Sequence, residues 1–162
     1  MFNKVLGIDP GLDGGLGFLS RDGAVKLYRM PTRAKFLKSG KKRREIDEDA
    51  LAKIIRAESP DVVWIEDVHA IGGKGKNGRR DGVVGAFSFG EGKGILKGVV
   101  GALGIPRRYV DPQVWKGALR LSAAKDEVAR ARALFPAYAE VISGSGPSEG
   151  LLIAFYGLCH TT

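Results

Sequence analysis

Short apolar runs separated by glycine-containing turns open the chain. Val5–Ile8, Gly15–Ser20 and Ala24–Met30 are rich in residues that favour strands. The turn Arg21-Asp22-Gly23 between the last two is typical of a tight hairpin. The pattern therefore predicts three antiparallel strands.

The next segment changes from basic to amphipathic. Pro31–Arg44 is basic and has no apolar periodicity, which predicts a loop. A helix from a cap at Asp47 to about Ala57 is predicted next. Its apolar positions fall close to helical spacing at Ile46, Leu51, Ile54 and Ile55.

A buried strand and a polar segment follow. Ser59-Pro60 ends the helix, and Val62–Glu66 is apolar and β-branched enough for a central strand with helices on both sides. Ala70–Gly82 contains too little apolar surface to order itself, so we expect it to be mobile.

The second half of the chain is mainly helical. Val83–Leu103 is spotted with glycine but apolar throughout, which predicts a long, closely packed helix ending before Pro106. Tyr109-Val110 begins a short strand. The remaining predicted helices are Val114–Leu119, Lys125–Phe135 and, after a Gly/Ser/Pro break at Ser143–Ser148, Glu149–Leu158.

Composition limits the class of protein. A chain of 162 residues with 44% hydrophobic residues fits one domain, residues 1–162, with a real core. Cys159 is the only cysteine, so no intrachain disulfide forms, and we expect it to fill space in the last helix. No segment reads as a signal peptide or a membrane span, which predicts a soluble cytoplasmic protein.

Acids and bases are distributed unequally. The net charge is +8, which favours polyanionic partners such as nucleic acid. Basic residues cluster in Lys35–Arg44 and Lys74–Arg80, whereas Asp9 and Glu66 end apolar strands. A carboxylate is costly on a buried strand unless a metal, a proton or a partner compensates it. Asp9 could also simply cap the Pro10-Gly11 turn.

Six motifs follow one another along nearly the whole chain. The first three are GIDPGLDGGLGF, WIEDVHA and FSFGEGKGILKGVVGALGIP. The other three are YVDPQVWK, KDEVARARALFP and EGLLIAFYGL. In this order they resemble the RuvC-type Holliday junction resolvases of the RNase H-like nuclease superfamily, particularly the short phage versions. A strand ending in Asp-x-Gly alone would also fit an actin-like or sugar-kinase-like ATPase, but 162 residues leave no room for the second nucleotide-binding half.

The resemblance implies an α/β RNase H-like fold, a five-stranded mixed sheet with helices on both faces. It also implies a homodimeric crossover junction endodeoxyribonuclease that hydrolyses phosphodiesters in branched DNA with two Mg²⁺ or Mn²⁺ ions per site. Carboxylates suit such hard ions. Asp9 would bridge the ions, Glu66 and Glu149 would bind them, and Lys125 would contact the phosphate, with Lys116 a weaker candidate.

The sequence departs from the family at one position. Family members usually carry two acids at the start of the last helix, three or four residues apart, but this chain has only Glu149. Ser145 and Gly146 stand where the second acid is expected. Three explanations are open: the natural protein has weakened catalytic activity, the acid was removed to trap a complex, or Asp67 or Asp111 takes its place. We favour a missing acid at Ser145.

Further residues are candidates for DNA contact and dimer formation. Phe87 or Phe89 could stack on an unpaired base or pack in the core, and Val83–Leu103 is the candidate dimer interface. Basic candidates for phosphate contact are Lys74, Lys76, Arg79, Arg80, Lys41, Lys42, Arg43 and Arg44. The rival function is a junction-binding module without catalysis.

Four residues have a simpler interpretation. Asp13 fits a turn residue and Trp115 fits an anchor packed on the sheet. Asp67 points to the strand face opposite Glu66, which favours a solvent or capping role. His69 stays undecided.

Overall fold

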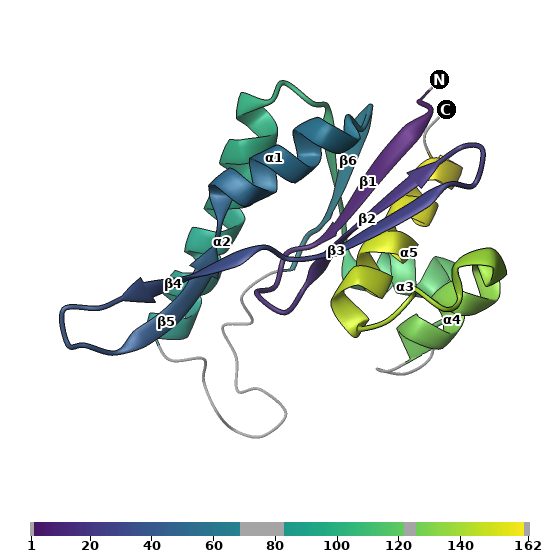
Figure 1. The fold of residues 1–162 in the computed structure, drawn as a ribbon. Coiled ribbons are helices and arrows are strands. Elements are labelled where there is room, and N and C mark those ends of the chain that lie inside the picture. The colour runs from purple at the N-terminus through teal and green to yellow at the C-terminus, as the bar shows by residue number, and fades with distance from the viewer. Residues whose placement is uncertain (1, 69–82, 122–125, 161–162) are drawn as a thin grey trace.

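A mixed sheet forms the centre of the computed structural model, which describes residues 2–68, 83–121 and 126–160. Antiparallel strands β1 (Lys4–Asp9), β2 (Gly15–Ser20) and β3 (Val25–Arg29) are followed by β6 (Val62–Glu66) and β7 (Arg107–Val110), which run parallel to β1. In the described residues this sheet has five strands in the order β3-β2-β1-β6-β7 (Figure 1). The predicted mixed sheet is confirmed.

A second, two-stranded sheet corrects the loop predicted for Pro31–Arg44. Strands β4 (Thr32–Phe36) and β5 (Lys42–Ile46) pair antiparallel as a hairpin that projects from the body of the protein (Figure 1). The prediction was wrong because nearly all of the hairpin is exposed on both faces, so no apolar alternation marks its strands.

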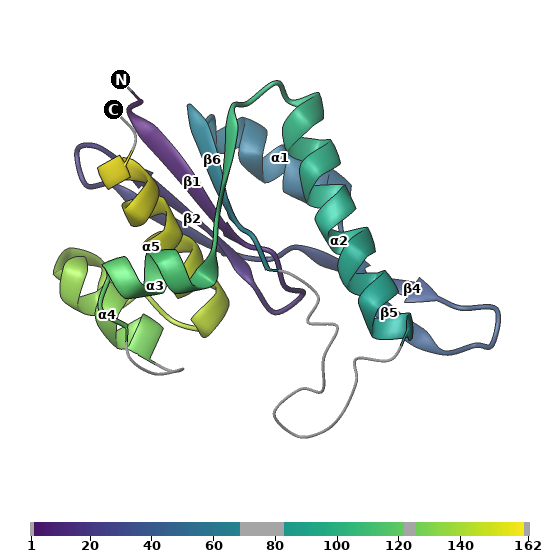
Figure 2. The ribbon, with the colours of Figure 1, turned by 180° about the vertical axis from the view of Figure 1, so that it is seen from behind.

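Two helices cover one face of the large sheet (Figure 2). In α1 (Glu48–Glu58), Asp47 Oδ1 accepts a hydrogen bond of 2.9 Å from the Ala50 amide, which confirms the predicted cap. The long helix α2 (Val83–Ala102) is also confirmed. The core between these helices and the sheet includes Leu6, Ile8, Leu16, Val63, Leu51, Ile55, Leu96 and Val100.

The other face carries α3 (Pro112–Ala118), α4 (Asp126–Leu134), the 3₁₀ turn η1 (Pro136–Tyr138) and α5 (Ser145–His160). The predicted break at Ser143–Ser148 is wrong in part, because α5 begins at Ser145. Pro147 lies in its first turn, where proline lacks only an amide that would be unsatisfied anyway. Cys159 is exposed, so its predicted space-filling role is also wrong.

Glycines let α5 lie directly on the strand backbones. A Cβ on Gly7 of β1 would overlap the backbone of Gly150 and Ala154, and a Cβ on Gly17 of β2 would overlap Leu151. This close approach sets the position of the start of α5 beside the turn between β1 and β2, where Gly14 bridges to Gly146.

We expect Gly7→Ala to destabilise the protein by about 3 kcal/mol, near the upper end for overpacking, because the helix backbone has to move. Chemical denaturation measures the change. The matched control is Gly117→Ala in α3, where a Cβ meets nothing within 4 Å. That change should be neutral or stabilise by up to about 1 kcal/mol. Equal stability of the two variants would contradict the tight packing of α5.

A buried charge cluster ties α1 to the sheet. Glu58 is only 5% exposed and accepts hydrogen bonds from Tyr28 (2.7 Å), Lys4 (2.9 Å) and Lys26 (3.0 Å). Burial by itself raises the pKa of the Glu58 carboxyl, but these three donors more than offset it and hold the pKa at about 2.

Because this folded-state pKa is depressed, the cluster stabilises the protein above the ordinary value of 4.5, and the contribution is lost as the pH falls from 4.5 to about 2. We expect a loss of roughly 3 kcal/mol across that window. Denaturation at several pH values measures it. Glu58→Gln should lower stability at pH 7 and make the loss of stability between pH 4.5 and about 2 less steep. An equally steep loss in this variant would rule the cluster out as the cause.

Candidate active site

Two carboxylates lie side by side at the carboxyl ends of parallel strands. Ile8 of β1 pairs with Ile65 of β6, so Asp9 and Glu66 are the next residues on neighbouring strands. Alternation along each strand puts Asp9 with Gly7, and Glu66 with Trp64, on the face that α5 covers.

A third carboxylate comes from the first turn and a half of α5. Glu149 Oε2 lies 3.3 Å from the ammonium group of Lys116 in α3, and its Oε1 accepts a hydrogen bond of 3.1 Å from the Ser145 hydroxyl. Lys116 also lies 3.5 Å from Glu127 of α4. Three elements distant in the sequence therefore meet at one end of the sheet.

Burial and the proximity of the acids to one another shift the pKa values of Asp9 and Glu66. Burial, the Glu149 charge and the Glu66 charge raise the pKa of Asp9 to about 7, although the Gly11 amide and Lys116 act in the opposite direction. Burial and Glu149 also raise the pKa of Glu66, against a hydrogen bond from the Trp115 indole. A cation among these groups would relieve both the burial and the repulsion.

The donor set fits a hard divalent ion. All three side chains offer carboxylate oxygens, the ligands that Mg²⁺ and Mn²⁺ prefer. In the described part of the chain, no group of three or more His, Cys, Asp or Glu side chains is already close enough to hold a metal ion. Lys116 serves as a cation for Glu149 in this arrangement. Burial lowers the pKa of Lys116, but Glu149 and Glu66 raise it more.

Ser145 lies where the resemblance predicts a missing acid. It is exposed, one helical turn before Glu149 on the same side of α5, and its hydroxyl donates to Glu149. It also lines a cavity of about 370 Å³ together with Asp13, Arg29, Thr32 and Arg44.

The two proposed substitutes for that acid are engaged elsewhere. Asp67 lies on the opposite strand face, as predicted, and it forms an ion pair of 2.9 Å with Lys93 of α2. Asp111 caps α3, accepting a hydrogen bond of 2.7 Å from the Gln113 amide. Its charge acts on Glu66, so it is near the site but is held by the helix.

Other predicted residues fall into three groups. Phe87 on α2 is 72% exposed, whereas Phe89 is half-buried beside Lys93. Lys41, Lys42, Arg43 and Arg44 lie on the β4–β5 hairpin and are exposed. Outside the described residues lie His69, Lys74, Lys76, Arg79, Arg80 and Lys125, together with the segment predicted to be mobile.

Trp115 has a role that sequence reasoning missed. It is fully buried, as predicted, but its indole N–H also donates a hydrogen bond of 3.0 Å to Glu66 Oε1. No local sequence signal marks this hydrogen bond, because its two residues are 49 positions apart and only the packing of α3 brings them together.

The five-stranded mixed sheet with helices on both faces resembles that of solved structures. No protein-family model matches the sequence, and no curated protein is significantly similar to it. RuvC from Thermus thermophilus aligns with a TM-score of 0.59 and 18% identity over 98% of this chain and 97% of that one. The same RuvC in complex with a Holliday junction substrate aligns with a TM-score of 0.63, again at 18% identity and over the same shares.

The chain therefore has the RNase H-like fold in the form found in RuvC. The yeast mitochondrial Holliday junction resolvase Ydc2 also aligns, at 13% identity over 96% of this chain and 82% of that one, but its TM-score of 0.48 is too low to support a conclusion.

Among the described residues no helix is both long and apolar enough to cross a membrane.

Proposed function

We propose that the protein is a metal-dependent endonuclease that cuts branched DNA, with four-way junctions as the principal substrate. The observation that carries the proposal is the convergence of Asp9, Glu66 and Glu149, from β1, β6 and α5, at one end of a RuvC-like fold. RuvC itself has been solved with a Holliday junction substrate.

Asp9, Glu66 and Glu149 would hold Mg²⁺ or Mn²⁺, two ions per site. When bound, the ions activate water and stabilise the charge that develops on the phosphate. The residues of the chain would orient this site: the Trp115 indole holds one oxygen of Glu66, and Lys116, 3.3 Å from Glu149, would contact a substrate phosphate.

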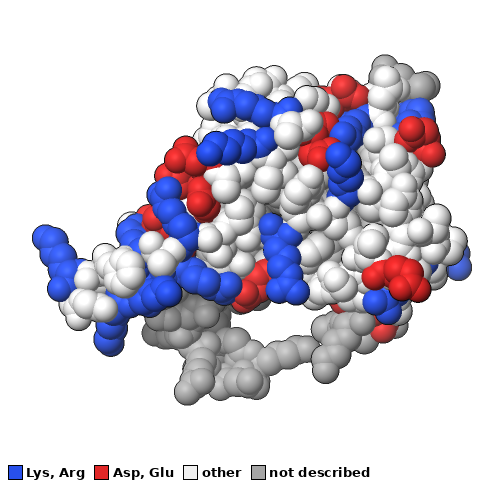
Figure 3. Space-filling view, viewed as in Figure 1, with Lys and Arg blue, Asp and Glu red and all other residues white. Residues whose placement is uncertain are grey.

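A basic surface supports binding to the DNA backbone. Lysine and arginine side chains gather on the β4–β5 hairpin (Figure 3). The exposed basic residues of this hairpin include Lys41, Lys42, Arg43 and Arg44. Such contacts are independent of base sequence and weaken steeply as salt rises.

The homodimer belongs to the same proposal. One side of α2 is exposed along Phe87, Gly90, Gly94 and Gly98, and at each of these three glycines a Cβ would meet nothing within 4 Å. Small residues allow two helices to approach closely. A monomer in light scattering would contradict this part.

The test compares cleavage and gel-shift of labelled four-way, forked and linear DNA with Mg²⁺ and with Mn²⁺. Cutting of branched but not linear DNA supports the nuclease. Binding of branched DNA without cleavage in the presence of either metal supports the second candidate, a junction-binding module. The serine at position 145 favours this candidate. Failure to bind branched DNA would overturn both.

A further inference from the structure

The β4–β5 hairpin is exposed to an unusual degree for a structured segment. Arg33–Phe36 and Lys38–Arg44 are all exposed, and the hairpin extends beyond the two layers of helices (Figure 1). A two-stranded ribbon of this kind is only marginally stable by itself. Its position therefore depends on the contacts that anchor it.

One face of the hairpin supplies the anchors. Arg33 pairs with Glu45 across the strands and reaches Glu48 at the start of α1, at 2.9 and 2.7 Å. Lys35 reaches Glu45 and Glu91 of α2, at 2.9 and 3.1 Å. This face is thus partly neutralised and is tied to both helices.

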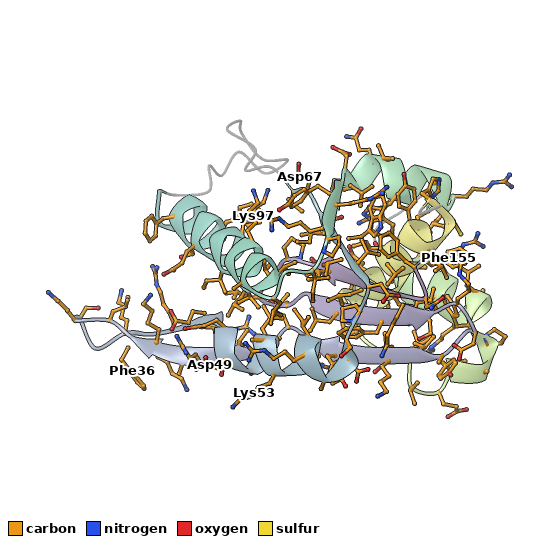
Figure 4. All side chains as sticks on the ribbon, turned by 90° about the horizontal axis from the view of Figure 1, so that it is seen from above. Phe36, Asp49, Lys53, Asp67, Lys97 and Phe155 are labelled. Carbon is orange, nitrogen blue, oxygen red and sulfur yellow. The ribbon has the colours of Figure 1, made fainter. Side chains whose placement is uncertain are left out.

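The opposite face keeps its basic and aromatic groups at the surface. Cross-strand pairing places Phe36 beside Lys42, and Ala34 beside Arg44. Phe36 is 74% exposed and points away from the body of the protein (Figure 4). A large aromatic side chain flanked by cations at the end of a ribbon contributes nothing to the core.

This second face begins at the cavity beside the start of α5. Thr32 and Arg44 line the cavity of about 370 Å³ that also contains Arg29 and Ser145. Arg44 forms a 2.7 Å ion pair with Asp13, whose side chain is 87% exposed. Exposed pairs contribute little to stability, so the guanidinium can exchange Asp13 for a phosphate at small cost.

We propose that this face is a duplex-binding surface that holds one arm of the branched substrate outside the cut site, an inference that rests on the proposed function. Lys42 and Arg44 contact phosphates, and Phe36 makes an apolar contact in the groove. A two-stranded ribbon fits the major groove, about 12 Å wide. A five-residue strand spans about 17 Å, about the length of 5 base pairs, so we expect the tip to contact the arm about that far from the branch.

Charge decides between DNA and a second copy of the chain as the occupant. Arg33–Arg44 contains seven lysines and arginines and no acid, so two copies meeting here would bring like charges together. A DNA arm brings a phosphate charge of the opposite sign every few ångströms along its axis.

Hydroxyl-radical footprinting on a four-way junction tests the proposal, with the double variant Phe36→Ala/Lys42→Ala in a buffer with Ca²⁺ to prevent cutting. In this variant, the DNA backbone about 4 to 6 base pairs from the branch should lose its protection, while the backbone at the branch stays protected. The position of the lost protection follows from the length of the hairpin strands. Affinity should fall about tenfold, and the salt dependence should decrease by about one phosphate contact.

The control is Arg21→Ala, a loss of one positive charge in the turn between β2 and β3 at the far end of the sheet. It should leave the footprint unchanged. An unchanged footprint in the double variant overturns the hairpin proposal alone. Absence of any branch protection by the unaltered protein overturns the proposed function instead. A change in oligomeric state of the double variant would assign the hairpin to contact between copies and overturn the DNA assignment.

Discussion

Asp9→Asn should reduce metal-dependent cleavage of branched DNA by about 10³-fold or more, since losing a ligand removes several kcal/mol of charge stabilisation. Binding of the same DNA should persist or strengthen, because a negative charge leaves the site. Cleavage rates and gel-shifts on one labelled junction measure both effects.

The same substitution has a readout that is independent of activity. The folded-state pKa of Asp9 is raised from 3.8 to about 7, so its ionisation destabilises the metal-free fold increasingly as the pH rises from about 4 to 7. Asp9→Asn should therefore raise the melting temperature at pH 8 more than at pH 5. Asp22→Asn, in the exposed turn between β2 and β3, is the matched control: the asparagine oxygen can still accept the hydrogen bond from the Ala24 amide, and the change should affect neither cleavage nor this pH dependence.

An Asp9→Asn variant that still cuts at the original rate would remove Asp9 from the reaction. Lost cleavage together with lost binding would instead indicate that the substitution damages the fold, and the melting temperature distinguishes the two.

Ser145→Asp should raise metal-dependent cleavage by about 10- to 100-fold, corresponding to about 1.4 to 2.8 kcal/mol of added stabilisation. The new carboxylate lies one helical turn before Glu149 on the same side of α5, where the Ser145 hydroxyl already reaches Glu149 at 3.1 Å. A negative charge at a helix start also favours the helix dipole, so the fold should tolerate it.

Ser145→Asn is the matched control, because it has the shape of aspartate without the charge, and it should give no gain. Mg²⁺ should raise the melting temperature of Ser145→Asp more than that of the unaltered protein. Equal cleavage by the aspartate and serine forms would contradict the missing-ligand hypothesis.

The hairpin illustrates a limit of sequence reasoning. Residues 31–44 were predicted to be a loop because strand prediction depends on alternation between a buried and an exposed face. The β4–β5 hairpin has no buried face along most of its length, and its support comes from Glu45, Glu48 and Glu91. Two of these acids belong to other elements, so the local pattern could not reveal the anchoring.

The start of α5 illustrates the same limit near the candidate site. Glycine, serine and proline in 143–148 predicted a break, yet the helix begins at Ser145 because Gly7, Gly15 and Gly17 let its backbone rest on the sheet. Intrinsic propensity is a weak guide where tertiary packing is this close. The helix thus begins four residues earlier than predicted, so Ser145 lies in it together with Glu149.

The sequence by itself determined the strands of the large sheet, the two helices α1 and α2 and the acids that end β1 and β6, because hydrophobic period and strand-end carboxylates are local signals. The tertiary structure decided which acids meet, how Lys116 and Trp115 engage them, and where the hairpin points. Those outcomes depend on contacts between segments far apart in the sequence, such as Asp9 and Glu149 or Glu66 and Trp115, and only the packed chain brings them within reach of one another.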